Sequence, residues 1–226
     1  MMISPETYCW LELQGKSAEE ILSKIRSLKQ EIGRLKNIAE HPHYIRTMDP
    51  SEEVRIELNR EYLAGAKQAY AEAGGVYVPS RAEQKAESFD KSIPNISKIK
   101  FTIGGHFHGF ETKTFTFGET DVRMYAEHSL FLEPTPTPDY EGEAPIDKEE
   151  FLDSLRDIHI GEWRTNYDTD RYGFLTLDGT EWDLTIEFSD GHKPVKCGGN
   201  NAYPYNFKKL TQLFELEYDL DEEEEE

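Results

Sequence analysis

Two histidines and a glutamate form the pattern with the clearest chemical potential in this sequence. His106 and His108 are two residues apart, and Glu111 follows soon after them. Side chains two residues apart on a β-strand point to the same face, so two imidazoles and a carboxylate can share a metal ion. The preceding Gly104-Gly105 pair instead favours a turn, which would remove that geometry. These residues define an alternative function, a metal-binding protein or metal-dependent enzyme, against the simpler interpretation of turn or surface histidines.

The two cysteines and the remaining polar motifs offer less chemistry. Cys197 has His192 nearby in sequence, but strand alternation places its thiol on the same face as Val195, where we expect it to be buried and inert. Cys9 and Cys197 are too few for a disulfide framework and too far apart to indicate a metal pair, so both are expected to be reduced thiols. No phosphate-binding glycine loop, nucleophile elbow or four-ligand zinc spacing occurs. The sequence therefore favours a protein without catalysis and without a cofactor.

Charge is distributed unevenly along the chain. The formal net charge is −20, and residues 101–226 carry 10 Lys/Arg against 30 Asp/Glu, while the preceding residues are close to neutral. Such a surface repels nucleic acid and anionic membranes and attracts basic surfaces. We therefore expect an acidic module that docks on a basic protein partner and does not bind nucleic acid directly. A sharper version is an inhibitor that mimics nucleic acid.

Nothing in the sequence indicates a membrane or secreted protein. No window of about 18 apolar residues is present to span a bilayer, and the N-terminus lacks the basic start and apolar core of a secretory signal. We expect a cytoplasmic protein.

Residues 17–73 carry the pattern of an antiparallel helical hairpin. Ser17-x-x-Glu20 is a capping box, and Asp49 before Pro50 predicts the start of the second helix. Apolar residues follow the first start in a coiled-coil heptad seam: Ile21, Ile25, Leu28, Ile32 and Leu35. Two helices cannot cover this much apolar seam, so we expect the hairpin to pack on the rest of the chain or to self-associate.

The chain changes to strand periodicity after residue 95. Ile99, Phe101 and Ile103 alternate with polar residues, as do Trp182 and Leu184 further on. A strand is also predicted over 110–117, and helices over 147–158 and 207–214. The expected fold class is α+β: an N-terminal antiparallel helical hairpin, then an antiparallel sheet covered by helices on one face.

Domain boundaries follow from these changes in pattern. Residues 1–95 are expected to form the helical hairpin with a short helix, and residues 96–218 the α+β domain. Within it, the acidic, proline-rich segment 133–147 lacks periodicity and is typical of a solvated loop. Residues 219–226 form a run of like charge that we expect to be a disordered tail.

The C-terminal half resembles a family of uncharacterised bacterial proteins that share a small domain with the pattern DGxxWxLxIxFxDG, then GxNAYP and a helix. The matching residues here are Asp178, Gly179, Trp182, Leu184, Ile186, Phe188, Asp190, Gly191, Gly199, Asn201, Ala202, Tyr203 and Pro204. The resemblance covers about residues 97–217 and brings no activity, ligand or catalytic residue with it. On the wet face of the strand at 181–188, Glu181, Asp183 and Glu187 are the residues we expect to contact a partner.

Overall fold

The structure is a computed structural model that describes residues 3–45, 49–105, 109–130, 140–141, 145–173 and 179–216. The chain forms two compact units, residues 1–80 and residues 81–226. The division falls earlier than the expected boundary at residue 95, because the helix after Ser80 packs on the second unit.

The first unit contains four helical segments: α1 (Pro5–Tyr8), the π-helical turn η1 (Cys9–Leu13), α2 (Ala18–Ala39) and α3 (Glu52–Glu72). The second unit contains helices α4 (Arg81–Ser92), α5 (Lys148–Asp157) and α6 (Phe207–Leu213), and the 3-10 turns η2 (Ile93–Asn95), η3 (Ile160–Glu162) and η4 (Thr169–Tyr172). Its strands are β1 (Ile96–Gly105), β2 (Gly109–Phe117), β3 (Asp121–Ser129), β4 (Tyr140–Glu141), β5 (Ile146–Asp147), β6 (Asn166–Asp168), β7 (Thr180–Phe188) and β8 (Val195–Asn200).

Helices α2 and α3 pack together as the predicted pair. The capping box is present, since the Ser17 backbone N–H donates to Glu20 Oε2 at 2.8 Å while the Ser17 hydroxyl accepts from the Glu20 N–H. The N-cap of α3 is Ser51, two residues later than the predicted start at Asp49. The buried seam lies between the helices and contains Ile21, Ile25, Leu28, Tyr62 and Ala66.

The N-terminal residues cover part of the apolar seam, which the sequence analysis did not foresee. Leu13 is buried in the same cluster as the two helices. Tyr8 stacks on Tyr62 with ring centroids 4.2 Å apart, and the Tyr62 hydroxyl donates to the Ile3 carbonyl at 2.5 Å. A third helical layer, α1 with η1, therefore supplies some of the cover that two helices lack. None of the described helices is long and apolar enough to cross a membrane.

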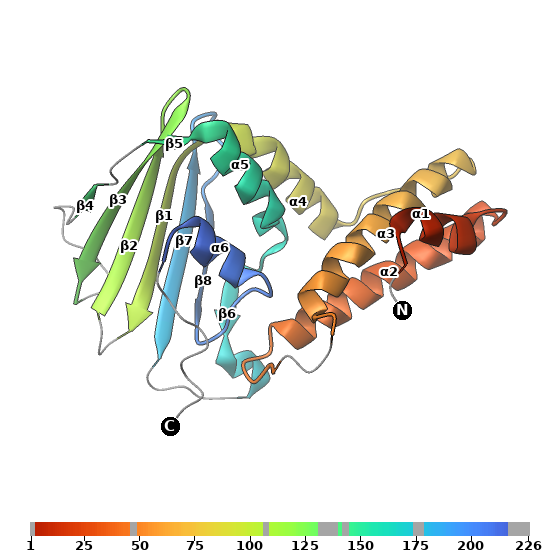
Figure 1. Cartoon of the computed structure of the whole chain (residues 1–226), viewed down its shortest axis with the longest axis horizontal. Coiled ribbons are helices and arrows are strands. Elements are labelled where there is room, and N and C mark those ends of the chain that lie inside the picture. The colour runs from red at the N-terminus through yellow and green to blue at the C-terminus, as the bar shows by residue number, and fades with distance from the viewer. Residues whose placement is uncertain are drawn as a thin grey trace. The chain divides into compact units, whose positions relative to one another are not determined.

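The described strands of the second unit form one eight-stranded sheet. The strand order is β4-β3-β2-β1-β7-β8-β6, with β5 also paired to β3. All neighbouring pairs are antiparallel except β6 and β8, which run parallel. Helices α5 and α6 lie against one face of the sheet (Figure 1). The α+β prediction, a helix pair followed by a mostly antiparallel sheet with helices, is confirmed.

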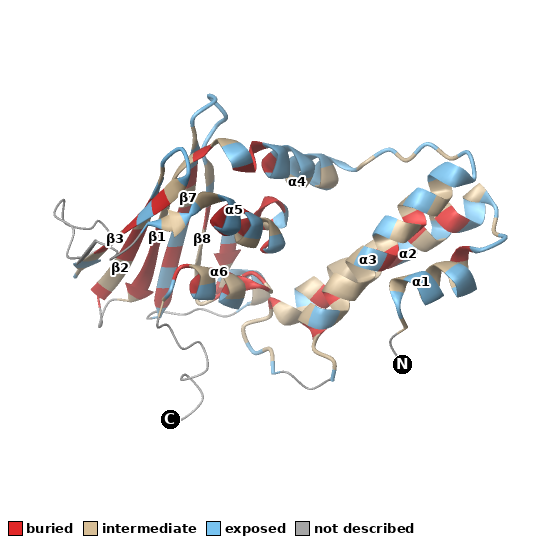
Figure 2. Ribbon diagram, turned by 45° about the horizontal axis from the view of Figure 1, so that its top comes forward, coloured by how far each residue is buried: buried red, intermediate tan, exposed pale blue. Residues whose placement is uncertain are grey.

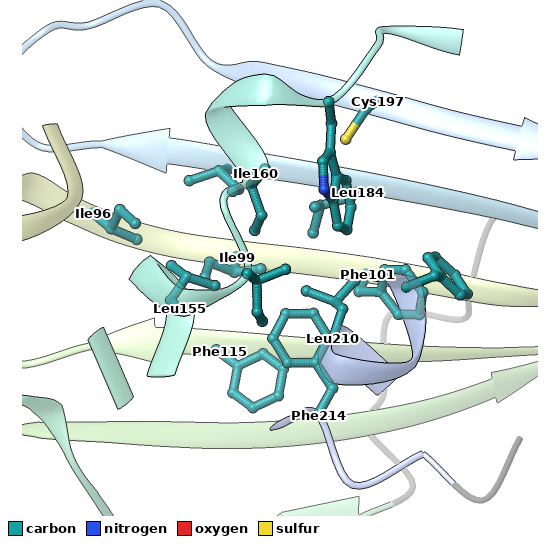
Figure 3. Packing of buried hydrophobic residues seen from close by; sticks show 14 of the residues in the cluster. Ile96, Ile99, Phe101, Phe115, Leu155, Ile160, Leu184, Cys197, Leu210 and Phe214 are labelled. Atoms are coloured by element: carbon teal, nitrogen blue, oxygen red, sulfur yellow. The ribbon is translucent and has the colours of Figure 1, made fainter. Parts of the chain in front are cut away.

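An aromatic core joins the helices to the sheet. Phe115 of β2 packs on Phe214 at 4.6 Å and on Phe151 of α5 at 5.2 Å between ring centroids. Phe101 of β1 lies 5.6 Å from the Phe214 ring, and Leu210 is fully buried beside them (Figure 3). Figure 2 shows the buried residues concentrated in the central strands. Burying aromatic side chains of this size supplies a large part of the driving force for folding.

Helix α4 belongs to this core. Phe89 is buried within it, and the Lys85 amine donates to the Trp163 carbonyl at 2.8 Å. Gly161 of η3 allows α4 to approach, because a Cβ at that position would lie 2.9 Å from the Ala86 Cα. The short helix is therefore attached to the sheet unit by packing as well as by sequence.

Most of the predicted loop 133–147 and the whole predicted tail 219–226 lie outside the residues that the structure describes. Of the predicted loop 133–147, the structure places β4 and β5 on the edge of β3. Residues 131–139, 142–144 and the predicted tail 219–226 lie outside the described residues.

Candidate functional site

Several residues of the DGxxWxLxIxFxDG and GxNAYP patterns form a structural junction at one end of β7, and Asp178 lies outside the described residues. Trp182 is buried, and its indole N–H donates to the Ala202 carbonyl at 3.0 Å. Asn201 adopts a left-handed backbone conformation, and its Oδ1 accepts from the Thr180 N–H at 2.8 Å. A Cβ on Gly179 would lie 1.9 Å from the Asn201 side chain, so any larger residue there must displace that side chain. These residues join β7 to the chain that follows β8, and their role is explained by the fold.

The second tryptophan strengthens the same junction. The Trp163 indole N–H donates to Asn206 Oδ1 at 3.0 Å, and Asn206 in turn donates to the Ile158 carbonyl. Trp163 also packs edge-on against Trp182 with centroids 6.1 Å apart. Because every polar atom named here has a partner, this buried network stabilises the unit.

Strand β6 shapes a shallow depression beside this junction. The three-residue strand pairs in parallel with Gly198, Gly199 and Asn200 of β8. A Cβ on Gly199 would lie 2.6 Å from the Tyr167 carbonyl oxygen, so glycine allows this close pairing. The resulting β6–β8 depression has a volume of about 310 Å³. The side chains with polar or charged ends along its wall include Asn166, Asp168, Glu181, Asp183, Lys196 and Asn200.

Asp183 is the most distinctive group in the β6–β8 depression. It lies opposite Gly198 on β8 and Thr102 on β1, so its carboxylate has no long neighbour directly across either strand. Partial burial raises the pKa of Asp183, and the amines of Lys196 and Lys100 oppose that shift. Among the described residues, none donates a hydrogen bond to this carboxylate. A cationic or hydrogen-bond-donating group from outside would stabilise its charged form.

The three residues predicted to contact a partner all lie on the sheet face opposite the aromatic core. Glu181, Asp183 and Glu187 are exposed and alternate with buried Trp182 and Leu184. Glu181 and Asp183 border the β6–β8 depression, whereas Glu187 pairs in register with Lys98 on β1. The three predicted residues thus differ in their surroundings, since Glu181 and Asp183 border the depression and Glu187 has a lysine as its neighbour across the strands.

The residues of the alternative metal site are only partly placed. His106 and His108 lie outside the described residues. Glu111 is described, and its carboxylate is 3.5 Å from the Lys113 amine, which also donates to the Glu215 carbonyl at 2.6 Å. Over the parts of the chain that the structure describes, no group of three or more His, Cys, Asp or Glu residues is positioned to hold a metal ion.

The cysteine prediction matches the environment of Cys197. Its side chain is buried, and burial raises the pKa of the Cys197 thiol to about 12. The thiolate is the reactive form of cysteine. Because the Cys197 thiol stays protonated at neutral pH, this residue is unreactive in the folded protein.

Sequence reasoning missed the part of the depression that β6 supplies. Residues 159–177 show no alternation from which a strand could be predicted, and Asn166 and Asp168 reach the depression only through parallel pairing with β8. The run of glycine and asparagine at 198–201 was the available signal, since it marks a close approach of backbone.

Comparison of the chain with protein-family models, with curated proteins and with solved structures gave no match. The function must therefore be inferred from the site itself.

Proposed function

We propose that this protein is a non-enzymatic binding protein whose sheet unit docks on another protein through the face that the helices leave uncovered. The observation that carries the proposal is the position of Glu181 and Asp183. Both carboxylates are exposed on that face, beside the β6–β8 depression, and Asp183 accepts no hydrogen bond from the described residues. A basic group of a partner protein supplies the missing interaction.

The charges on this face favour a protein partner with a limited basic patch. A mimic of nucleic acid requires a continuous anionic track, whereas Lys98, Lys100 and Lys196 lie on the same face as the acidic residues. Much of the acidity lies elsewhere: segments 131–144 and 217–226 contain four and eight acidic residues, respectively, and no Lys or Arg. These segments add long-range attraction to a basic partner without defining where it docks.

The proposal is tested by affinity enrichment from extract of the native host, with the triple variant Glu181→Gln, Asp183→Asn, Glu187→Gln. Exposed charges contribute about 0.5 kcal/mol each to an interface, so three neutralisations weaken a specific partner roughly tenfold. The matched control neutralises three exposed acidic residues on helices of the same unit: Glu87, Glu149 and Asp157.

A specific partner is retained by the wild type and by the control and is lost from the triple variant. Retention should also fall between low and moderate salt, because the contact is electrostatic. Equal retention by the two variants would show that the uncovered face is not the docking surface.

A further inference from the structure

The chain that connects the two units begins on the helix pair. Gly74 adopts a left-handed backbone conformation, with φ of 82°, and turns the chain out of α3. The Gly75 N–H then donates to the Tyr70 carbonyl at 2.9 Å, which completes the end of the helix. Residues 76–80 form neither helix nor strand before α4 begins. We call these five residues the connecting segment.

One side chain of the connecting segment, Tyr77, points back to the helix pair. Its ring is half-buried and packs against the apolar cluster between α2 and α3. The neighbouring Val76 and Val78 side chains are 83% and 78% exposed, so they contribute little to holding the chain in place. Tyr77 is therefore the anchor of the connecting segment on the helix pair.

Two lysines from different helices hold the Tyr77 side chain. The Lys29 amine of α2 donates a hydrogen bond to the Tyr77 hydroxyl at 3.1 Å. The Lys67 amine of α3 lies 4.6 Å from the centroid of the Tyr77 ring. An ammonium group in this position is attracted by the negative charge of the aromatic face. Tyr77 thus links α2 to α3, and both lysine contacts are lost if the connecting segment moves away.

These contacts determine where the chain leaves the helix pair. With Tyr77 in place, the part of the chain beyond the anchor is Val78–Ser80, which spans at most about 10 Å. It includes Pro79, whose ring fixes its φ angle. With Tyr77 released, this part lengthens to residues 76–80, spans at most about 17 Å and can pivot at the preceding glycines. The sheet unit then reaches farther and in more directions.

We propose that Tyr77, Lys29 and Lys67 form a latch that restricts the orientation of the sheet unit relative to the helix pair, and that the latch opens while both units stay folded. A contact of either kind changes an equilibrium about two- to tenfold, so the latch opens more readily than a unit unfolds. A closed latch lowers the entropic cost of binding for a partner that contacts both units. This inference is independent of the docking surface proposed for the sheet unit.

Distances between spin labels on the two units test the latch in the full-length chain. The labels are attached at Glu61→Cys on α3 and Glu87→Cys on α4, both of which are exposed positions. The background carries Cys9→Ser, and Cys197 is buried and unreactive. Pulsed electron paramagnetic resonance then gives the distribution of distances across the connecting segment.

The latch variant is Lys29→Met with Lys67→Met, which keeps much of the length of each side chain and removes both charges. We expect its distance distribution to be broader than that of the wild type by about 7 Å, the length that two released residues add. Lys29→Arg with Lys67→Arg should behave as the wild type, because guanidinium groups also donate hydrogen bonds and stack on aromatic rings.

A matched control makes the same change in charge away from the latch. Lys193→Met with Lys208→Met alters two exposed lysines of the sheet unit and should leave the distribution unchanged. Circular dichroism verifies that the helix pair is folded in each variant. Tryptophan fluorescence does the same for the sheet unit, in which Trp163 and Trp182 are buried.

Limited proteolysis measures the released population independently. Thermolysin cleaves before valine and binds an extended segment on both sides of the bond, so cleavage before Val76 requires release of Tyr77. When the latch opens and closes faster than the protease cuts, the cleavage rate follows the population of the open form. We expect the latch variant to be cleaved there about tenfold faster than the wild type. Tyr77→Phe, which lacks only the hydroxyl, should lie between them.

Three outcomes would overturn the inference. A wild-type distribution as broad as that of the latch variant shows that Tyr77 does not restrict the sheet unit. Equal cleavage before Val76 in the wild type and in the folded latch variant shows that the lysines do not hold the connecting segment. If the latch variant loses helical structure, Tyr77→Ala removes the same contacts from the other side, and an unbroadened distribution in that variant excludes the latch.

Discussion

Replacing Gly179 with alanine should disrupt the junction that anchors β7. The added Cβ would lie 1.9 Å from Asn201 Nδ2 and 2.2 Å from its Oδ1. Because real contacts of this kind do not occur, the Asn201 side chain must leave its position. The Thr180 N–H then loses its 2.8 Å acceptor at a residue that is only 3% exposed.

The expected cost follows from that lost acceptor. Leaving a buried backbone donor unsatisfied costs about 1–3 kcal/mol, and displacing the packed side chain adds about 1 kcal/mol of strain. We therefore expect Gly179→Ala to destabilise the sheet unit by about 2–4 kcal/mol. Urea unfolding followed by tryptophan fluorescence measures this, because Trp163 and Trp182 are buried whereas Trp10 of the other unit is 65% exposed.

A double-mutant cycle with Asn201→Gly checks the mechanism. Glycine retains the left-handed conformation of residue 201 and removes the side chain that the new Cβ would strike. In that background Gly179→Ala should cost less than about 1 kcal/mol, since the steric conflict is already gone. Additive effects of the two substitutions would refute this account of the junction.

Three further outcomes follow from the structure. Gly33 lies inside α2 with nothing within 4 Å of an added Cβ, so Gly33→Ala should stabilise the helix pair by about 0.5–1 kcal/mol in a thermal melt monitored by circular dichroism. In a Cys9→Ser background, Cys197 should react with a thiol reagent only at the rate of unfolding, and rapid labelling of the folded protein would contradict its burial. The raised pKa of Asp183 means that its contribution to stability is present below the unfolded pKa and is lost as pH rises through the folded pKa. Asp183→Asn should therefore raise the melting temperature slightly at pH 7 and leave it unchanged at pH 3. A rise in melting temperature at pH 3 but not at pH 7 would refute burial as the cause of the raised pKa of Asp183.

The sequence predicted the elements whose periodicity is regular. The helix pair, the buried faces of β1 and β7, and helices α5 and α6 were all readable, because each carries a sustained apolar pattern. For example, Ile99, Phe101 and Ile103 face Ile186, Leu184 and Trp182 in register.

The alternation of β2 did not reveal which face is buried. Phe115 and Lys113 share the core face, and threonines occupy the other. Lys113 is tolerated there because its amine reaches the Glu215 carbonyl, two residues beyond α6, and the Glu111 carboxylate. A long-range partner of this kind leaves no local signal in the sequence.

The candidate site was readable only in part. Strand alternation correctly placed Glu181, Asp183 and Glu187 on the outward face of β7. The neighbours of these residues across the strands depend on the register of β1, β7 and β8, and the β6–β8 depression depends on a parallel pairing between distant residues. Both arise from tertiary pairing, which a single sequence does not specify.

The shortness of strands β4 and β6 limits how this protein can assemble. They lie at opposite ends of the sheet order and contain two and three residues, respectively. An exposed long edge would let one sheet add to the next without end, as in fibrils, but edges this short offer few backbone groups to a neighbour. Growth from edge to edge through these two strands is thereby discouraged. The short end strands of the sheet thus protect the described part of this unit against open-ended association.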